Sequence, residues 1–154
     1  MLNESIHIAK HTARYLRQYI SHNHLQNRYL QRECMSSPLL GMPNDASRYV
    51  TWQDNLSADF HRLALLIVYV FEAKLDAMDY SDRLQNLLTQ LKDAACSMEN
   101  TAILSHRPLY YTARPSSVPE VYRGIRDQAR RDRRNCVLAR RVHEVLENMA
   151  PTYS

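Results

Sequence analysis

Apolar residues recur at steps of three and four along most of the chain, which is the spacing of one face of an α-helix. Asn3, a residue type that often caps helices, precedes the first such stretch, and we expect a helix over about 4–33. Polarity rises over 21–24, which makes that stretch a candidate break or bend. The apolar positions that define the buried face are Ile6, Ala9, Ala13, Leu16 and Ile20.

Two more helices are expected in the middle of the chain. Ser57 would cap one over about 58–77, which should be the most buried helix because 63–71 is apolar on every side. Ser81 would cap the next over about 82–98, where leucines follow the clearest amphipathic pattern in the sequence. Because the link between them is short, these two helices should form a central antiparallel hairpin.

The last helix is expected over about 118–149, because Ser117-Val118-Pro119-Glu120 is typical of a capping box with proline in the first turn. The intervening stretches 35–56 and 99–117 contain prolines and other turn residues, and both are long loops for a compact domain. The first is too apolar for a free linker, so we expect it to pack on the body or to bind a partner. The residues expected in this partner-binding loop are Leu39, Leu40, Met42, Tyr49 and Trp52.

Composition supports an all-α fold. Only two glycines, Gly41 and Gly124, occur among 154 residues. Average usage would give roughly eleven. A β-rich domain of this size would need many tight turns, and such turns depend on glycine. We therefore expect one helical domain over 1–154, a small bundle of about four helices with two long irregular loops.

The sequence predicts a cytoplasmic protein with no membrane partner. No apolar stretch approaches the roughly 18 residues of a membrane span, and the first residues lack the basic and apolar regions of a secretory signal. The three cysteines, Cys34, Cys96 and Cys136, lie far apart in the sequence. An odd count without a signal indicates reduced thiols, each expected as a small and mostly buried apolar residue.

Basic charge is concentrated at the two ends of the chain. All but three of the 20 basic residues are arginines, and the segment 54–100 is acidic. In a helix over 118–149, steps of i, i+3, i+4 and i+7 would place most of the arginines there along one side, where they could bind phosphate oxygens. That side could also face an acidic protein or solvent, and no base-reading motif accompanies it. These candidate binding residues are Arg123, Arg126, Arg130, Arg131, Arg133, Arg134, Arg140 and Arg141.

Patterns for catalysis and metal binding are weak. His7 and His11 are spaced i, i+4 and could share a metal ion, but no cysteine or carboxylate follows at a complementary short spacing. With so few glycines there is no nucleophile elbow, phosphate-binding loop or dinucleotide fingerprint. We therefore expect no catalytic residue, metal or cofactor, and a protein that acts by binding.

The stretch Tyr29-Leu30-Gln31-Arg32-Glu33-Cys34, followed by Ser37-Pro38-Leu39 and Pro43-Asn44-Asp45, resembles the gene-B replication proteins of temperate tailed phages of enteric bacteria. The likeness covers mainly the first third of the chain. It implies a phage replication accessory protein that acts on the host replicative helicase as its loader, in the bacterial cytoplasm and without an ATPase of its own. The partner would be the helicase, with single-stranded DNA as a second candidate, in a homo-oligomer or a hetero-oligomer with the helicase.

Two other classes of function stay open. The protein could be a small transcriptional regulator that binds duplex DNA as a dimer. It could also be a protein-interaction adaptor with no nucleic-acid role, its arginines matching an acidic surface.

Overall fold

The structure, a computed structural model, describes residues 1–154 except 44, 46, 47, 50, 111 and 112, and helices are the only regular secondary structure among them. Asn44, which belongs to the resemblance, lies outside the described residues. The expected all-α class is confirmed, but the expected count of four helices is wrong, because the described residues form five α-helices and three short 3₁₀ helices. These are α1 (Leu2–Asn23), α2 (Arg28–Ser36), α3 (Trp52–Asp76), α4 (Ser81–Leu104), η1 (Pro115–Ser117), η2 (Glu120–Tyr122), α5 (Gln128–Met149) and η3 (Ala150–Tyr153).

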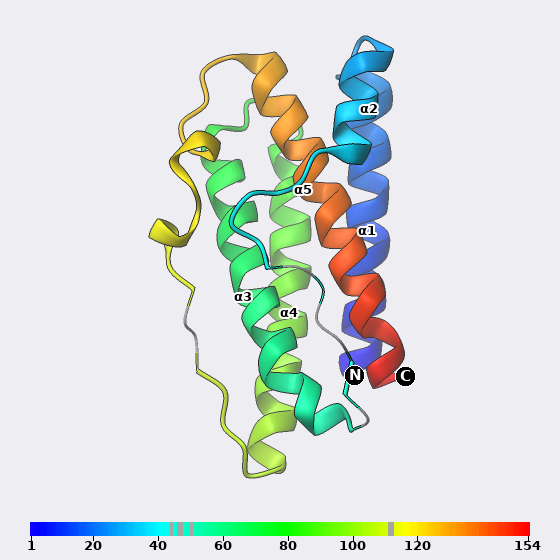
Figure 1. The fold of residues 1–154 in the computed structure, drawn as a ribbon, viewed down its shortest axis with the longest axis vertical. Helices are drawn as coiled ribbons and strands as arrows, with labels where there is room; N and C mark the ends of the chain where they lie inside the picture. Colours follow the sequence, from blue (N-terminus) through cyan, green and yellow to red (C-terminus); the bar gives the residue numbers. More distant parts are fainter. Residues whose placement is uncertain (44, 46–47, 50, 111–112) are drawn as a thin grey trace.

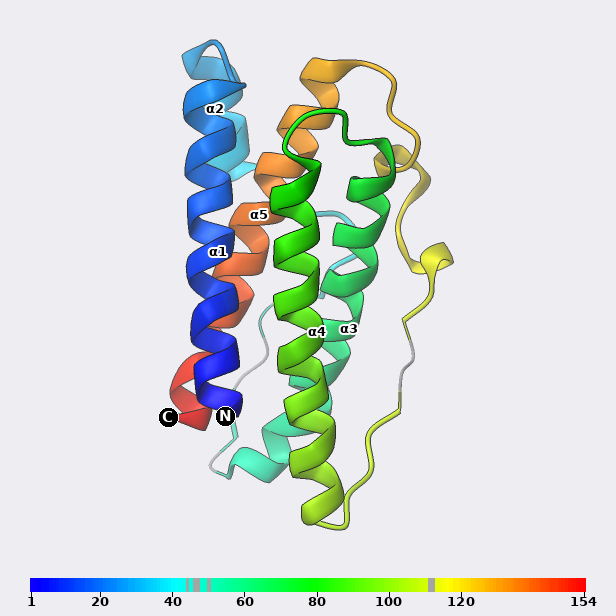
Figure 2. The same cartoon turned by 180° about the vertical axis from the view of Figure 1, so that it is seen from behind.

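The four long helices α1, α3, α4 and α5 form a bundle in which packed neighbours run antiparallel, with both chain ends at the same end of the molecule (Figures 1 and 2). Helix α1 packs on α4 and α5, and α3 packs on the same two helices. The pair α3 and α4, expected as a central hairpin, is therefore one wall of the bundle. All four long helices share the core, which also takes in Leu39 and Val118 from the connecting segments.

The helix expected over 4–33 is two helices, since the chain turns after Asn23 and α2 folds back to pack against α5 (Figure 1). The side chain of Asn27 caps α2 by accepting a hydrogen bond from the amide of Leu30 at 2.9 Å. Gln31 donates to two backbone carbonyls in and just after the last turn of α1. Polar side chains therefore stabilise a full reversal of the chain, where the rise in polarity over 21–24 predicts only a possible break or bend.

Helix α3 begins at Trp52, earlier than expected, so Ser57 is an exposed residue inside it and not its cap. Thr51 stands at the N-cap, and the preceding chain is fixed by Asn55, whose side chain accepts from the amide of Tyr49 and donates to its carbonyl, both at 3.1 Å. Asn55 is buried. A buried amide with both partners satisfied thus ties the end of the long loop to α3.

Helix α5 begins at Gln128, later than expected, and the capping box expected at 117–120 is wrong. Ser117 lies in η1, and Asp127 caps α5 by accepting from the amide of Arg130 at 3.1 Å. Gly124 has φ +60°, a left-handed conformation that interrupts a right-handed helix. A helix starting near residue 118 is therefore broken by the backbone before it can reach Gln128.

A disulfide joins α2 to α5. Cys34 and Cys136, separated by 102 residues, are both buried and bonded, with their Cα atoms 5.5 Å apart. Cys96 is a free, exposed cysteine. The expectation of reduced thiols is therefore wrong for Cys34 and Cys136, which form the disulfide. The expectation of a mostly buried side chain is wrong for Cys96. The cause is the reversal of the chain after α1, because only this reversal brings α2 onto α5.

Candidate partner-binding site

The eight arginines expected along one side of the last helix do not form a single row. Arg123 and Arg126 precede α5, so helical geometry does not align them with the others. Arg134 faces inward and is only 5% exposed. Its guanidinium forms a two-pronged ion pair with Asp76, with nitrogen–oxygen distances of 2.5 and 2.6 Å, and also donates to the carbonyl of Tyr122 at 2.9 Å. A buried charge is tolerated only when it is paired in this way, so the guanidinium of Arg134 is used inside the fold.

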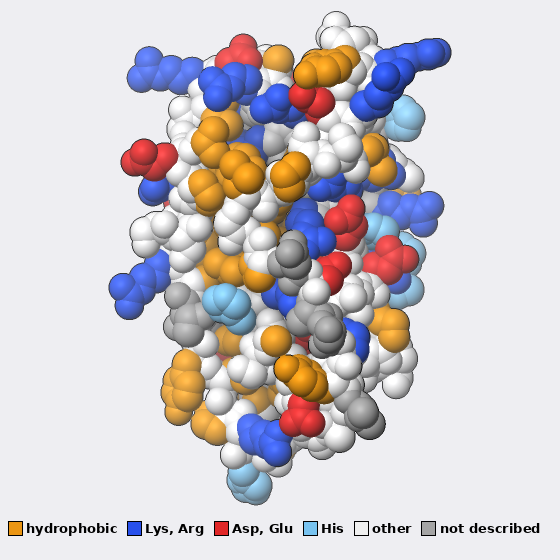
Figure 3. Space-filling view, in the orientation of Figure 1, with side chains coloured by type: hydrophobic (Ala, Val, Ile, Leu, Met, Phe, Trp, Pro, Cys, Tyr) orange, Lys and Arg blue, Asp and Glu red, His pale blue; other side chains and the backbone are white. Residues whose placement is uncertain are grey.

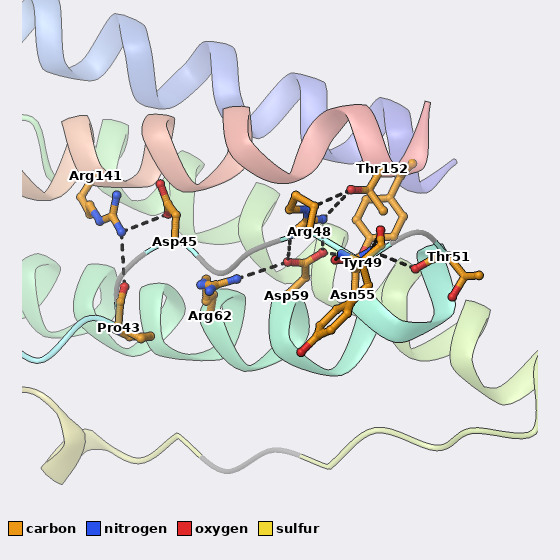
Figure 4. Close-up of polar contacts among 11 residues, drawn as sticks. Pro43, Asp45, Arg48, Tyr49, Thr51, Asn55, Asp59, Arg62, Arg141 and Thr152 are labelled. Carbon is orange, nitrogen blue, oxygen red and sulfur yellow. Dashed lines mark hydrogen bonds and ion pairs between the residues drawn. The ribbon is translucent and has the colours of Figure 1, made fainter.

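Two further arginines of α5 position the segment that follows α2. Arg140 is buried and donates to the carbonyl of Ser37 at 2.5 Å. Burial lowers the pKa of Arg140 below its ordinary value, against the opposing effect of Glu144. Arg141 donates to the carbonyl of Pro43 at 3.3 Å and pairs with Asp45 at 3.1 Å, as Figure 4 shows. These arginines therefore fix the start and the later part of the segment over 37–45.

Two more arginines bind groups of the protein itself. Arg131 donates to the carbonyls of Ile125 at 3.2 Å and Arg126 at 2.9 Å, which holds the extended chain against the first turn of α5. Arg133 pairs with Glu33 of α2 at 2.8 Å while staying partly exposed. The hydrogen bond from Arg133 holds the pKa of the Glu33 carboxyl below its ordinary value, with a smaller effect from a hydrogen bond with Tyr29.

Of these eight arginines, only Arg123, Arg126 and Arg130 have side chains that make neither an ion pair nor a hydrogen bond with another described residue. Arg126 and Arg130 are exposed, and neither side chain has a hydrogen bond to a described residue. Arg123 is half-buried, and its Nε has no partner among the described residues. Among these eight arginines, the free positive charge thus lies just before α5 and in its first turn.

The short segment over 37–42 presents the side chain of Leu40 to solvent from a fixed backbone. The Tyr69 hydroxyl of α3 donates to the carbonyl of Leu40 at 2.6 Å, and the amide of Leu40 donates to the Tyr122 hydroxyl at 2.9 Å. Burial raises the pKa of Tyr69 to about 12, so its hydroxyl stays a donor at neutral pH. Leu39 points into the core, while Leu40 is 53% exposed.

Gly41 permits this arrangement for two reasons. Its φ of +83° is a conformation that residues with a side chain rarely adopt. In addition, a Cβ at this position would collide with the Tyr69 hydroxyl. Glycine at 41 is therefore what allows Tyr69 to approach and hold the backbone of Leu40.

A pocket of roughly 220 Å³ opens beside Leu40, between the segment after α2, the chain around η2 and the first half of α5. In the upper part of the face that Figure 3 shows, hydrophobic side chains gather, with Lys and Arg side chains above them. The structure thus joins one residue of the expected loop to three of the expected arginines. The pocket is lined by Leu40, Val121, Tyr122, Ile125 and Val137, by Ser37 and Pro38, and by Arg130, Arg133 and Arg134.

The other expected loop residues lie away from this pocket. Met42 is half-buried against the core, and Trp52 is the half-buried first residue of α3. Tyr49 is exposed close to α3 (Figure 4). The expected loop therefore divides into a pocket-lining part around Leu40 and a part that anchors the chain to α3.

The anchor is a polar network around Asp59, which is fully buried on α3 (Figure 4). Arg48 binds both of its carboxylate oxygens, at 2.6 and 2.7 Å, and the Tyr153 hydroxyl donates to it at 2.5 Å. Arg62 lies 3.5 Å from the same carboxylate. Burial, and then the charge of Asp59, raises the pKa of Tyr153. Because every partner belongs to the chain itself, this network joins the loop and the C-terminal turn to the bundle and offers no site.

Sequence reasoning assigned no site role to Val121, Ile125 or Val137, which line the pocket, or to Tyr69, which holds the backbone of Leu40. The only local signal was the excess of tyrosine over phenylalanine, which is typical of side chains that pack on one side and hydrogen-bond on the other.

Other candidate chemistry stays limited in the described residues. The Nε2 atoms of His7 and His11 lie 3.0 Å apart in a hydrogen bond. No group of three potential metal ligands occurs in the part of the chain that the structure describes. None of its helices is long and apolar enough to cross a membrane.

The pocket with its arginine rim is therefore the strongest candidate site in the described residues. No protein-family model, curated protein or solved structure matches this chain, so its function rests on the geometry of this site.

Proposed function

We propose that this protein is a non-enzymatic adaptor that binds a partner protein through the pocket beside Leu40. The observation that carries the proposal is that Leu40 is half-exposed while both polar groups of its backbone are hydrogen-bonded to tyrosines. A leucine held outward in this way loses little conformational freedom on binding, and such preorganisation favours affinity. Val121, 49% exposed at the same pocket, adds a second apolar contact.

A protein partner fits this site better than a nucleic-acid backbone does. Arg134, Arg140 and Arg141 are engaged within the protein, which leaves a short cluster in place of a long basic row. Phosphate binding depends on the number of free basic contacts, whereas the core of a protein interface is apolar with a polar rim. The pocket has the composition of a protein interface, with an apolar centre and a polar rim.

The resemblance to gene-B replication proteins makes a replicative helicase the first candidate partner. In this proposal the protein is a helicase loader of the bacterial cytoplasm that brings no catalytic group of its own. Single-stranded DNA is a secondary candidate, contacted by the exposed arginines at the end of the molecule where α2 and α5 begin. Those arginines are Arg28, Arg32, Arg126 and Arg130.

The proposal is tested by mixing the purified protein with the purified replicative helicase of an enteric bacterium and measuring co-elution by size-exclusion chromatography with light scattering. The wild-type protein should form a complex, and Leu40→Asp should abolish it. Leu104→Asp is the matched control, because Leu104 is an exposed leucine and the last residue of α4, and α4 ends at the end of the bundle opposite to the start of α5 (Figure 1). Absence of a complex with the wild type, or equal loss with both variants, would contradict the proposal.

The nucleic-acid contact is tested separately with fluorescein-labelled single-stranded oligonucleotide at several salt concentrations. Binding that weakens with salt and is lost in Arg126→Ala/Arg130→Ala would support the secondary contact. Binding that these substitutions leave unchanged would show that Arg126 and Arg130 have no DNA-binding role.

A further inference from the structure

We infer that the pocket receives a bulky apolar side chain, such as phenylalanine or leucine, from a segment of the partner in which acidic residues flank it. The inference rests on the proposed adaptor function and specifies the chemistry of the partner segment. It joins two features that the structure places together, an apolar hollow and a rim of positive charge.

The size of the pocket favours a side chain over a free small molecule. Its volume of roughly 220 Å³ is below the roughly 300–1,000 Å³ of typical small-molecule sites. Leu40, Val121 and Val137 offer apolar walls, and the Leu40 wall is held by hydrogen bonds from Tyr69 and to Tyr122. An apolar anchor in a preformed pocket is the usual centre of a protein interface.

The charge around the pocket favours acidic flanks. No carboxylate is among the described residues that line it, whereas Arg130, Arg133 and Arg134 are. Asp76 neutralises Arg134, and Glu33 binds Arg133 from α2 at 2.8 Å. The side chain of Arg130 has no such partner among the described residues and is exposed.

The pair formed by Glu33 and Arg133 shows how a carboxylate is bound at this rim. The carboxylate comes from a neighbouring helix and reaches a partly exposed guanidinium at the edge of the pocket. Arg130 offers the same planar donor group to a carboxylate from outside the molecule. Arg126, also exposed and without a side-chain partner among the described residues, extends the positive rim along the chain that leads into α5.

The probe is a short synthetic peptide with a central phenylalanine and acidic residues on both sides, titrated into the ¹⁵N-labelled protein and followed by NMR. A second peptide replaces the phenylalanine by serine, and a third replaces the acidic residues by lysine. We expect the first peptide to shift the amides over 37–42, 118–125 and 130–137. Burying the phenylalanine should make it bind roughly ten- to a hundredfold tighter than the serine peptide.

Charge reversal at the rim supplies the decisive comparison. Arg130→Glu should weaken binding of the acidic phenylalanine peptide at least severalfold and should strengthen binding of the lysine peptide. Val121→Asp should abolish the preference for phenylalanine over serine. Lys92→Glu, which makes the same charge change on an exposed position of α4, should alter neither result.

Equal affinity for the phenylalanine and serine peptides would overturn the inference, as would an Arg130→Glu variant that binds the acidic peptide unchanged. No binding of the acidic peptide at millimolar concentration would overturn it as well. If the peptides fail but the helicase complex still depends on Leu40, the adaptor proposal stands and only the partner chemistry is wrong. If the peptides bind as expected and the helicase does not, the helicase is the wrong partner.

Discussion

Replacing Arg134 by alanine should destabilise the protein far more than the same change at Arg130. The side chains of Arg134 and Asp76 are 4% and 14% exposed, so the substitution leaves a mostly buried carboxylate without its counter-charge. Removing one partner of a buried ion pair lowers the free energy of unfolding by about 3–5 kcal/mol. For a chain of this size that corresponds to a fall in melting temperature of roughly 6–20 °C. Arg130 is exposed, and its loss should change stability by less than about 0.5 kcal/mol.

Thermal and urea denaturation followed by circular dichroism measure both variants against the wild type. The double variant Asp76→Leu/Arg134→Leu should be more stable than Arg134→Ala, because it removes the buried charge together with its partner. An Arg134→Ala protein as stable as Arg130→Ala would refute the reasoning. It would show that the inward-facing pair does not hold α5 against α3, and the division of the arginines into structural and free groups would be wrong.

Three further predictions concern the disulfide, the glycine that follows Leu40 and the half-buried histidine of α5. Replacing both cysteines of the disulfide by serine should lower the free energy of unfolding by up to about 4.7 kcal/mol, which is the loop-entropy value for a loop of this length. Urea midpoints that are equal with and without dithiothreitol would contradict the presence of the bond. Gly41→Ala should destabilise more than Gly124→Ala in thermal denaturation, because both glycines have positive φ but only at 41 does the added Cβ meet the Tyr69 hydroxyl. Burial lowers the pKa of His143, against the opposing effect of Glu147. The unfolded chain therefore binds more protons than the folded protein near pH 6. The free energy of unfolding should fall as the pH drops through and below 6.5. The variant His143→Gln should show a flatter pH dependence in urea titrations between pH 5 and 8, and an unchanged slope would assign the pH dependence to other groups.

The helical elements could be predicted largely from local patterns. The apolar run in α3 and the leucine spacing in α4 identify helices without reference to the rest of the fold, because a face that must be buried repeats with the helical period. Boundaries were less secure where apolar spacing continued across a break. Asn27 caps α2 and Asp127 caps α5, but apolar periodicity alone does not show that a helix starts at either point. The left-handed Gly124 prevents the helix that the capping-box pattern at 117–120 predicts.

The candidate site could be predicted only in its parts. The expected loop contained Leu40, and the expected arginine cluster contained Arg130 and Arg133, but nothing in their spacing indicated that they line the same pocket. That contact depends on α2 folding back onto α5, and on Tyr69 and Tyr122 holding the segment between them. The tyrosines come from other elements far along the chain, so no window of sequence contains the arrangement.

The amino-acid sequence by itself determined an all-α protein with a basic C-terminal part, because helix formation and net charge depend on residues close together in the chain. The tertiary structure decided which charges are free and which are used inside the fold. Arg134 and Arg130 are near neighbours in one helix, yet one is buried against Asp76 and the other faces solvent. The physical reason is that the burial of a side chain depends on which helix packs beside it, and that packing is set by the whole bundle.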